Sequence, residues 1–229
     1  MNGITPNWPA PTWVRAVTTT RSLNLVLAQD RTILSQDFNF MYEPIWLNQT
    51  HSSNVIEIKS PKRERGPEAD GAWTMLTGVP CAVLTGDCLP LLLCDSNGTI
   101  VAAVHCGWRG IAQGIIEKTV KQIGLNAQGE ILAWLGPAIG QSNYEVGEDF
   151  REPFLKHDLR ASIAFKETEK PGKWLADIKE LAKQRLQDSG VSAIYGSDLC
   201  TYTDPQRFYS YRRDKDTGRM ATLIWLTLP

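Results

Sequence analysis

Two histidines and one cysteine, His51, Cys88 and His105, lie where apolar segments of the chain meet polar turns. Two neutral imidazoles and a thiolate are borderline-soft ligands that suit Zn²⁺ and also suit copper. Three such ligands leave a fourth coordination position for water or substrate, as in catalytic zinc sites. The residue types therefore predict an open metal site, provided that folding brings the three separate segments together.

A metal-free site would use the same atoms. Cys88 as a thiolate with His105 as its base would form a nucleophile pair, with Asp87 or another carboxylate orienting the imidazole. Cys88 and His105 adjoin nearly pure apolar runs, which are typical of buried strands that hold their end residues rigidly. The alternative function is thus a Cys-His hydrolase acting on an amide or peptide-like substrate.

The remaining histidine and cysteines carry weaker signals. His157 lies between Lys156 and Asp158 and is expected to be solvated. The five cysteines are odd in number and lie mostly in apolar runs, so we expect no disulfide framework. The absence of any C-x-x-C spacing argues against a closed structural zinc site. The cysteines expected to be small core residues are Cys81, Cys94 and Cys106.

Several arginines could build an anion site near the same segments. Arg21, Arg109, Arg212 and Arg213 carry guanidinium groups of the kind that pairs with phosphate in a bidentate manner. A helix predicted to begin after Gly110 would add exposed N–H groups and the positive end of its dipole. Each arginine taken alone fits a surface salt bridge better, so only their combination predicts phosphate binding.

Composition and charge exclude several classes of protein. The formal net charge of −1 over 229 residues and the pI near 6.3 give no general attraction to nucleic acid or to an anionic membrane. No apolar run approaches the roughly 18 to 20 residues of a membrane span, and the first residues do not resemble a signal peptide. We therefore expect a cytoplasmic protein that binds small molecules, as a monomer or weak homodimer.

Apolar runs bounded by turn signals define the strands that would position these residues. Ser96-Asn97-Gly98 predicts a hairpin turn, because Asn-Gly supplies the positive φ that tight turns require. The segments predicted as strands are Trp13 to Thr19, Pro44 to Leu47, Asn54 to Ile58, Ala69 to Trp73, Val79 to Thr85, Leu89 to Asp95, Ile100 to His105, Ile131 to Leu135, Ser192 to Leu199, Arg207 to Arg213 and Arg219 to Leu228.

Three helices are predicted between the strands. The first follows Gly110 and carries an apolar stripe that Gly124 would end as a left-handed cap. The second runs from Val146 to His157 with an interruption at Pro153, and the third from Trp174 to Gln187.

Strands grouped early and late, with few helices among them, predict an α+β fold with mixed or antiparallel sheets. A doubly wound parallel sheet would need a helix after nearly every strand. Within this fold, His51 is expected in a polar turn that joins two short strands as a hairpin. Lys59 to Glu68 is expected to be an exposed loop, and Asp214 to Gly218 the turn of a final hairpin.

A set of motifs spread from Trp13 to Leu228 resembles the YfiH-type laccase-domain family. Their order along the chain makes the resemblance specific. The motifs are Leu47-Asn48-Gln49-Thr50-His51, Gly86-Asp87-Cys88-Leu89-Pro90, Val104-His105-Cys106-Gly107-Trp108-Arg109-Gly110, Gly136-Pro137-Ala138-Ile139-Gly140, Tyr144-Glu145-Val146-Gly147, Phe208-Tyr209-Ser210-Tyr211-Arg212-Arg213 and Thr217-Gly218-Arg219.

The resemblance implies a single α+β domain over residues 1–229, with layered mixed β-sheets and flanking helices. It implies Zn²⁺, with copper as the alternative, bound by His51, Cys88 and His105. The implied activity is a purine nucleoside phosphorylase that uses phosphate on adenosine, inosine, guanosine and methylthioadenosine, with adenosine deaminase activity. Older descriptions name polyphenol oxidases, and editing of peptidoglycan precursors has been proposed for bacterial members.

Roles are also expected for individual side chains. Cys88, His105 and Asp87 are expected to take part in catalysis. The expected substrate or phosphate contacts are Arg21, Gln49 and Arg109. One departure concerns residues 21–40, which lack the glycine-rich loop and Gly-Asp-Asp element of the family. If that region helps to close the pocket, a change in substrate range or activity is expected.

The chain itself discriminates among these activities. A multicopper oxidase needs on the order of ten histidines, because imidazole is the main ligand at each copper, and this chain has three. The H-x-E and P-C-x-x-C signature of zinc nucleobase deaminases is also absent, so deamination would need another acid/base group, such as Asp87. A catalytically silent metabolite-binding protein is the third class of function that the sequence allows.

Overall fold

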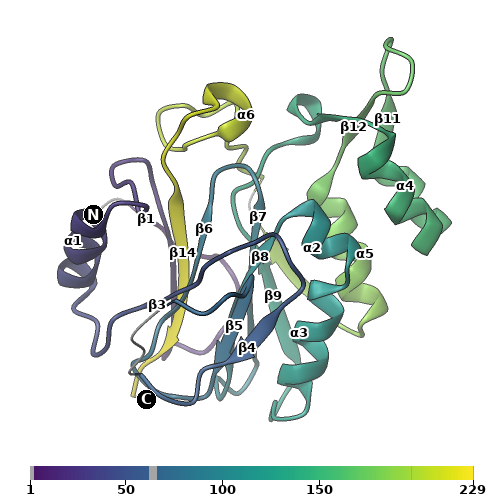
Figure 1. The fold of residues 1–229 in the computed structure, drawn as a ribbon. Helices are drawn as coiled ribbons and strands as arrows, with labels where there is room; N and C mark the ends of the chain where they lie inside the picture. Colours follow the sequence, from purple (N-terminus) through teal and green to yellow (C-terminus); the bar gives the residue numbers. More distant parts are fainter. Residues whose placement is uncertain (1–2, 62–65, 197, 229) are drawn as a thin grey trace.

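The computed structural model describes residues 3–61, 66–196 and 198–228, which form four layers. Two mixed β-sheets lie face to face, with one helix covering the outer side of the smaller sheet and several covering the outer side of the larger (Figure 1). Apolar clusters fill all three spaces between the layers. This arrangement confirms the predicted α+β class with layered mixed sheets.

The larger sheet has six strands in the order β13-β9-β7-β8-β5-β4. Because both of its faces are covered, the central strands lose their polar alternation, and all seven residues of β7 are buried. The strands are β4 (Val55–Glu57), β5 (Gly71–Thr74), β7 (Leu89–Asp95), β8 (Val101–Cys106), β9 (Ile131–Leu135) and β13 (Ala193–Gly196).

The smaller of the two facing sheets has five strands in the order β1-β2-β14-β6-β3. Side chains of β6 and β14 meet those of β7 and β8 in the cluster between the sheets. The strands are β1 (Gly3–Ile4), β2 (Val14–Thr19), β3 (Ile45–Trp46), β6 (Cys81–Thr85) and β14 (Met220–Leu226).

Helices and a third small sheet complete the outer layers. The three-stranded sheet β10-β12-β11 lies beside α4 at one edge of the molecule (Figure 1). Its strands are β10 (Glu145–Val146), β11 (Phe165–Glu167) and β12 (Trp174–Ala176). The helices are α1 (Ala28–Phe38), α2 (Trp108–Ala112), α3 (Ile115–Gly124), α4 (Glu148–His157), α5 (Ile178–Asp188) and α6 (Tyr211–Asp214), with 3-10 turns at Gln141–Asn143 and Leu159–Ala164.

The helix predicted after Gly110 is present but is divided into α2 and α3. Gly114, with φ +83°, takes the left-handed conformation between them. Gly124 is the last residue of α3, and Leu125 beyond it has φ −67°. The predicted left-handed cap at Gly124 was therefore wrong, because the chain uses its left-handed glycine ten residues earlier, at the bend.

Two other predicted elements differ from the structure, and one helix was not predicted. Trp174 belongs to β12, because Asp177 caps the N-terminus of α5 with bonds to the N–H groups of Lys179 and Glu180. The segment 207–213 is a loop leading into α6 rather than a strand, so no final hairpin forms. Residues 21–40 contain α1, whose weak apolar periodicity explains why sequence patterning missed it.

The segment around His51 also differs from the predicted hairpin. β3 pairs in parallel with β6 in one sheet, and β4 pairs in parallel with β5 in the other. His51 thus lies in a connection that crosses from one facing sheet to the other. The predicted loop 59–68 and strand 192–199 extend over residues 62–65 and 197, which lie outside the described residues. None of the described helices is long and apolar enough to cross a membrane.

Candidate metal centre

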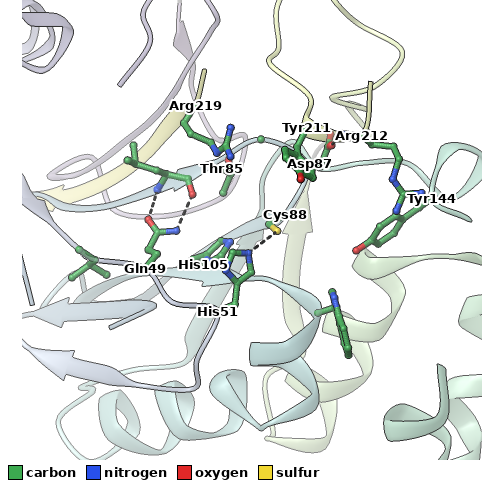
Figure 2. Close-up of a pocket in the computed structure, with 14 residues that line it drawn as sticks. Gln49, His51, Thr85, Asp87, Cys88, His105, Tyr144, Tyr211, Arg212 and Arg219 are labelled. Carbon is green, nitrogen blue, oxygen red and sulfur yellow. Dashed lines mark hydrogen bonds between the residues drawn. The ribbon is translucent and has the colours of Figure 1, made fainter. Parts of the chain in front are cut away.

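His51, Cys88 and His105 come together at one end of the β7–β8 pair. One potential ligand atom from each residue lies within 4.8 Å of those of the other two. Cys88 Sγ is 4.0 Å from His51 Nε2, and the two imidazole centroids are 4.8 Å apart. Figure 2 shows the three side chains pointing toward one another. The structure therefore brings together the three residues predicted as metal ligands.

Strand register explains why two of the ligands meet. β7 and β8 are antiparallel, with Pro90 opposite His105, so Cys88 lies just before β7 and His105 near the end of β8. Gly107 keeps the space between the ligands open. A Cβ there would lie 2.9 Å from His51 Cδ2, 3.4 Å from His105 Cε1 and 3.6 Å from Cys88 Sγ.

A buried carboxylate, Asp70, anchors this ligand group. It accepts hydrogen bonds from the backbone N–H groups of Thr50, His51 and Ser52 at 3.2, 3.0 and 2.7 Å, and from the Ser52 hydroxyl at 2.8 Å. Its Oδ1 also lies 2.8 Å from His105 Nδ1. With Nδ1 so engaged, His105 is left with Nε2 for a metal, which is the usual outer-shell arrangement at metal-binding histidines.

Sequence reasoning did not single out Asp70, although it allowed for an unnamed carboxylate beside His105. The signal that could have found it is a lone aspartate at the start of the apolar run 69–73, a position where a carboxylate is costly unless it has partners. Antiparallel pairing of β5 with β8 then places Asp70 beside His105, whose N–H donates to the Asp70 carbonyl at 2.6 Å.

Mutual electrostatics set the charges of this group. Burial raises the pKa of Asp70, but the hydrogen bonds from His105 and Ser52 outweigh it and lower that pKa to about 2. Burial opposes charge on Cys88 as well, yet the nearby His105 and His51 lower the pKa of its thiol to about 6. Conversely, Cys88 and Asp70 overcome burial and raise the pKa of His105 to about 9. The three groups therefore favour one another's charged forms, the carboxylate of Asp70, the imidazolium of His105 and the thiolate of Cys88.

Two of the residues around the site have unusual backbone conformations. His51 has φ +60° and Asp87 has φ +103°, values that side-chain-bearing residues seldom adopt. Such conformations cost on the order of 1–3 kcal/mol each and persist where surrounding contacts enforce them. At His51 the enforcing contacts are the bonds from three consecutive N–H groups to Asp70.

Asp87 binds the C-terminal segment rather than His105. Its carboxylate accepts hydrogen bonds from the Thr201 hydroxyl at 2.6 Å, the Ser210 hydroxyl at 3.0 Å and the Arg212 N–H at 2.6 Å. The carboxylate that orients the imidazole of His105 is therefore Asp70. Asp87 nevertheless lines the cavity, and its acid/base role stays a prediction.

A cavity of about 640 Å³ opens above the ligand group. One wall carries Gln49, whose side-chain amide bonds to both the N–H and the carbonyl of Leu84 at 2.7 and 2.9 Å, and so joins two segments of the wall. The cavity is lined by Leu47, Gln49, His51, Leu84, Thr85, Gly86, Asp87, Cys88, His105, Trp108, Tyr144, Tyr211, Arg212 and Arg219 (Figure 2).

Of the four arginines predicted to build an anion site, Arg212 lines this cavity, whereas Arg21, Arg109 and Arg213 do not. Arg21 lies in a separate surface depression, where it donates to the Pro205 carbonyl at 2.5 Å. Arg109 is exposed and lies over the Trp108 ring at 4.3 Å. Arg219, which was not among the four predicted arginines, also lines the cavity. No residue of the shortened segment 21–40 lines the cavity, so that departure from the family pattern leaves the described wall intact.

The donor set fits one borderline-soft metal ion. Two imidazoles, a thiol with a low pKa and a buried carboxylate behind one imidazole are the components of a zinc-type site with an open position. Among the described residues, this is the one group of three or more potential ligands close enough to hold an ion. A blue-copper centre plus a trinuclear copper cluster therefore does not fit the described chain.

Comparison with known proteins places this chain in a family. A family model described as multi-copper polyphenol oxidoreductase laccase matches residues 22–227. A Pseudomonas aeruginosa protein and an Escherichia coli protein, YfiH, both named purine nucleoside phosphorylase, are each 43% identical over 242 residues, which cover 97% of this chain and 98% of each relative.

Solved structures extend the likeness to the whole fold. A Neisseria meningitidis protein superposes with a TM-score of 0.91 at 38% identity over 100% of both chains. YlmD from Geobacillus stearothermophilus superposes with a TM-score of 0.88 at 27% identity, covering 95% of this chain and 93% of that one. Together with the family match, these likenesses show that the chain belongs to the YfiH-type laccase-domain family.

Proposed function

We propose that this protein is a zinc-dependent purine nucleoside phosphorylase. The observation that carries the proposal is a His-Cys-His ligand group at the base of a cavity of about 640 Å³ whose wall also holds two arginines. Relatives that share 43% of the sequence over nearly their whole length bear that name. The proposed substrates are adenosine, inosine, guanosine and methylthioadenosine, with adenosine deamination as a side activity.

Phosphorolysis sets three requirements for the cavity. A phosphate oxygen forms a bond to C1′ of the ribose while the C1′–N9 bond breaks. The electron pair of that bond goes to the purine, and the proton of hydrogen phosphate balances it. The site must therefore bind an anion, accommodate a flat heterocycle and stabilise the charge that develops on both.

The residues of the cavity match these requirements. Guanidinium groups of Arg212 and Arg219 supply positive charge. The rings of Trp108, Tyr144 and Tyr211 supply flat apolar surface for a purine. Direct contacts from Arg21 and Arg109 stay predictions, since neither side chain lines the cavity. Gln49 also stays a predicted substrate contact, although its side-chain amide is hydrogen-bonded to the backbone of Leu84.

In this proposal His51, Cys88 and His105 hold the ion, and Asp70 keeps the imidazole of His105 in place. A zinc ion bound there would supply Lewis-acid chemistry. Gly107 leaves room between the three ligands. For deamination, Asp87 is the only carboxylate among the described residues that line the cavity, and three donors already engage it. Phosphorolysis is accordingly the better-supported of the two activities.

The test is chromatography of products from adenosine, inosine and methylthioadenosine, each with and without phosphate, on protein whose metal content has been measured. Phosphate-dependent release of adenine and hypoxanthine is expected, and His51→Ala should abolish both metal binding and release. Unchanged metal content and unchanged release in His51→Ala would contradict the site assignment.

A Cys-His hydrolase is the second candidate, favoured by the pKa of about 6 for the Cys88 thiol and by the proximity of both imidazoles. A nucleophilic thiolate of this kind needs no metal. The two candidates respond in opposite ways to chelation. Activity on amide substrates that survives chelation but is lost on thiol alkylation would favour the hydrolase.

A further inference from the structure

One wall of the cavity holds a buried hydroxyl that lacks a partner. Thr85 is the last residue of β6, is 2% exposed and lines the cavity. Its Oγ1 makes no hydrogen bond within the described part of the chain. A buried polar group without a partner is costly, and native structures rarely keep one without a reason. Because Thr85 borders the cavity, a ligand at this wall is the group that would complete its bonding.

The guanidinium group of Arg219 lies at the same wall. Thr85 pairs with Met220 in the β6–β14 register, which places Arg219 beside Gly86. A Cβ added to Gly86 would lie 3.3 Å from Arg219 Cδ and 3.6 Å from its Nη1. Glycine at position 86 therefore permits the close approach of this arginine, and Figure 2 shows its side chain next to Thr85.

Arg219 is held in place but not neutralised. Its Nη1 donates to the carbonyls of Thr217 and Gly218 at 2.9 and 3.0 Å, and its guanidinium lies 5.9 Å from the Tyr211 ring centroid. Nε and Nη2 make no hydrogen bond to the described residues, and no described carboxylate forms an ion pair with it. A fixed guanidinium with donors to spare is suited to bidentate binding of an oxyanion.

The second arginine of the cavity occupies a different wall. Arg212 donates to the Glu145 carbonyl at 2.7 Å, and its guanidinium lies 5.1 Å from the Tyr144 ring centroid. Figure 2 shows Arg212 beside Tyr144 and away from Thr85. The unpartnered hydroxyl of Thr85 lies at the Arg219 wall and not at the Arg212 wall. A tetrahedral anion at the Arg219 wall can accept hydrogen bonds from both Thr85 and Arg219.

We propose that Thr85 and Arg219 form the subsite for the phosphate co-substrate, in preference to Arg21 and Arg109. This inference rests on the proposed phosphorolysis for its biological meaning, but phosphate binding can be measured without turnover. The tetrahedral anion could come from inorganic phosphate or from the phosphoryl group of a nucleotide. Both sources share the chemistry that the wall recognises, so the experiment contains an arm for each.

The experiment measures binding and kinetics on the same metal-loaded variants. Thr85→Val removes the hydroxyl while keeping the side-chain volume. Arg219→Lys keeps the positive charge while removing the paired N–H donors of the guanidinium group. Each should raise the Kd of inorganic phosphate in calorimetry, and the KM for phosphate, by about tenfold or more, since bonds to charged groups are worth at least that factor. The KM for inosine should stay within about twofold, and Thr85→Ser should restore phosphate binding.

Two matched variants control for general damage. Thr222→Val removes another buried hydroxyl, bonded to Thr18 on the neighbouring strand and outside the cavity, and should leave the Kd of phosphate unchanged. Arg160→Lys changes an arginine that is paired with Asp158 and Asp188 outside the cavity, and it should also leave the Kd of phosphate unchanged. A tenfold rise in Arg212→Lys, with Thr85→Val and Arg219→Lys unchanged, would overturn the assignment by placing the anion at the other wall.

The remaining outcomes separate the two proposals. In one outcome the wild-type protein binds phosphate but releases no base, and Thr85→Val no longer binds phosphate. This outcome would support the subsite and contradict the phosphorylase. Normal release with phosphate constants unchanged in Thr85→Val and Arg219→Lys would contradict the subsite alone. If adenosine 5′-monophosphate binds in a Thr85-dependent manner while inorganic phosphate does not bind, the ligand is a phosphate ester and the co-substrate assignment is overturned.

Discussion

The two ends of the β7–β8 pair are built alike but serve different purposes. Each end has a fully buried aspartate that collects several hydrogen-bond donors. Asp70 gathers three successive N–H groups, a hydroxyl and the imidazole of His105. Asp95 gathers the N–H groups of Thr99, Ile100 and Gln128 and the Thr99 hydroxyl. The end whose aspartate contacts a titratable side chain, His105, is the end at which we propose the metal centre.

Backbone conformation separates the two ends as well. At the Asp95 end the left-handed position is Gly98, with φ +63°, a residue that pays no Cβ penalty there. At the other end the left-handed positions are His51 and Asp87. Gly98 adopts this conformation without steric cost, whereas at His51 and Asp87 the surrounding hydrogen bonds must hold it.

The largest difference is expected between two cysteines on the same strand pair, Cys88 and Cys94. Cys88→Ser should lower metal content and phosphorolysis by at least about 100-fold, because it removes the thiolate ligand. Cys94→Ala should leave both unchanged and lower the free energy of unfolding by about 1 kcal/mol, since it opens a small cavity in the core. Metal analysis, product chromatography and urea unfolding check both variants. Equal metal content in the two variants would remove the functional distinction between the ends.

The aspartates offer a second comparison. Asp70→Asn should weaken metal binding by about 10- to 100-fold, as loss of an outer-shell carboxylate does elsewhere, and Asp95→Asn should not affect it. Both should destabilise the fold by about 1–3 kcal/mol, because an amide nitrogen would face donors that now meet an oxygen. Competition with a chromophoric chelator measures the metal affinity. A loss of affinity in Asp95→Asn comparable to that in Asp70→Asn would show that the two ends are coupled.

Acid titration sharpens the structural role of Asp95. Burial would raise the pKa of this carboxyl, but the bonds from Thr99, Gln128 and Ile100 outweigh burial and lower it. A pKa lower in the folded state means that the stabilisation is present above the unfolded pKa of about 3.9 and is lost as pH falls through the folded pKa. Wild type should therefore exceed Asp95→Asn in unfolding free energy at pH 7, with a gap that shrinks below about pH 4. Urea unfolding between pH 2.5 and 7 measures this difference in unfolding free energy. A difference that stays constant over this range would contradict the lowered pKa of Asp95.

The sequence predicted the three candidate metal ligands but not the carboxylate that holds them in place. His51, Cys88 and His105 were candidates because they lie where apolar runs meet polar turns, and the family resemblance implied them as one metal-binding set. The strands 89–95 and 100–105 follow from buried β-patterning. Asp70 escaped because its importance depends on pairing between β5 and β8, which sequence spacing alone does not reveal.

The errors have physical reasons of the same kind. Trp174 looked helical because it precedes a strong amphipathic pattern, but the cap at Asp177 begins that helix later. Arg207 to Arg213 looked like a strand because it contains three aromatic residues, a type that is enriched in strands. In the structure the buried Asp87 carboxylate binds Ser210 and the Arg212 N–H instead, and the segment turns into α6. In both cases an aspartate side chain accepts hydrogen bonds from backbone N–H groups and so sets the local structure. The local sequence pattern does not reveal these bonds.

The smallest expected effect concerns the backbone strain at His51. His51→Ala and His51→Gly both remove the imidazole, so both should lose the metal, but only Ala keeps a Cβ at φ +60°. A left-handed residue with a Cβ costs roughly 1–2 kcal/mol, part of which the greater freedom of glycine in the unfolded chain offsets. His51→Gly should therefore be more stable than His51→Ala by about 0.5–1 kcal/mol in urea unfolding of the metal-free proteins. If Ala were the more stable variant, the bonds to Asp70 would hold residue 51 without measurable strain, and the contrast with Gly98 would lose its energetic basis.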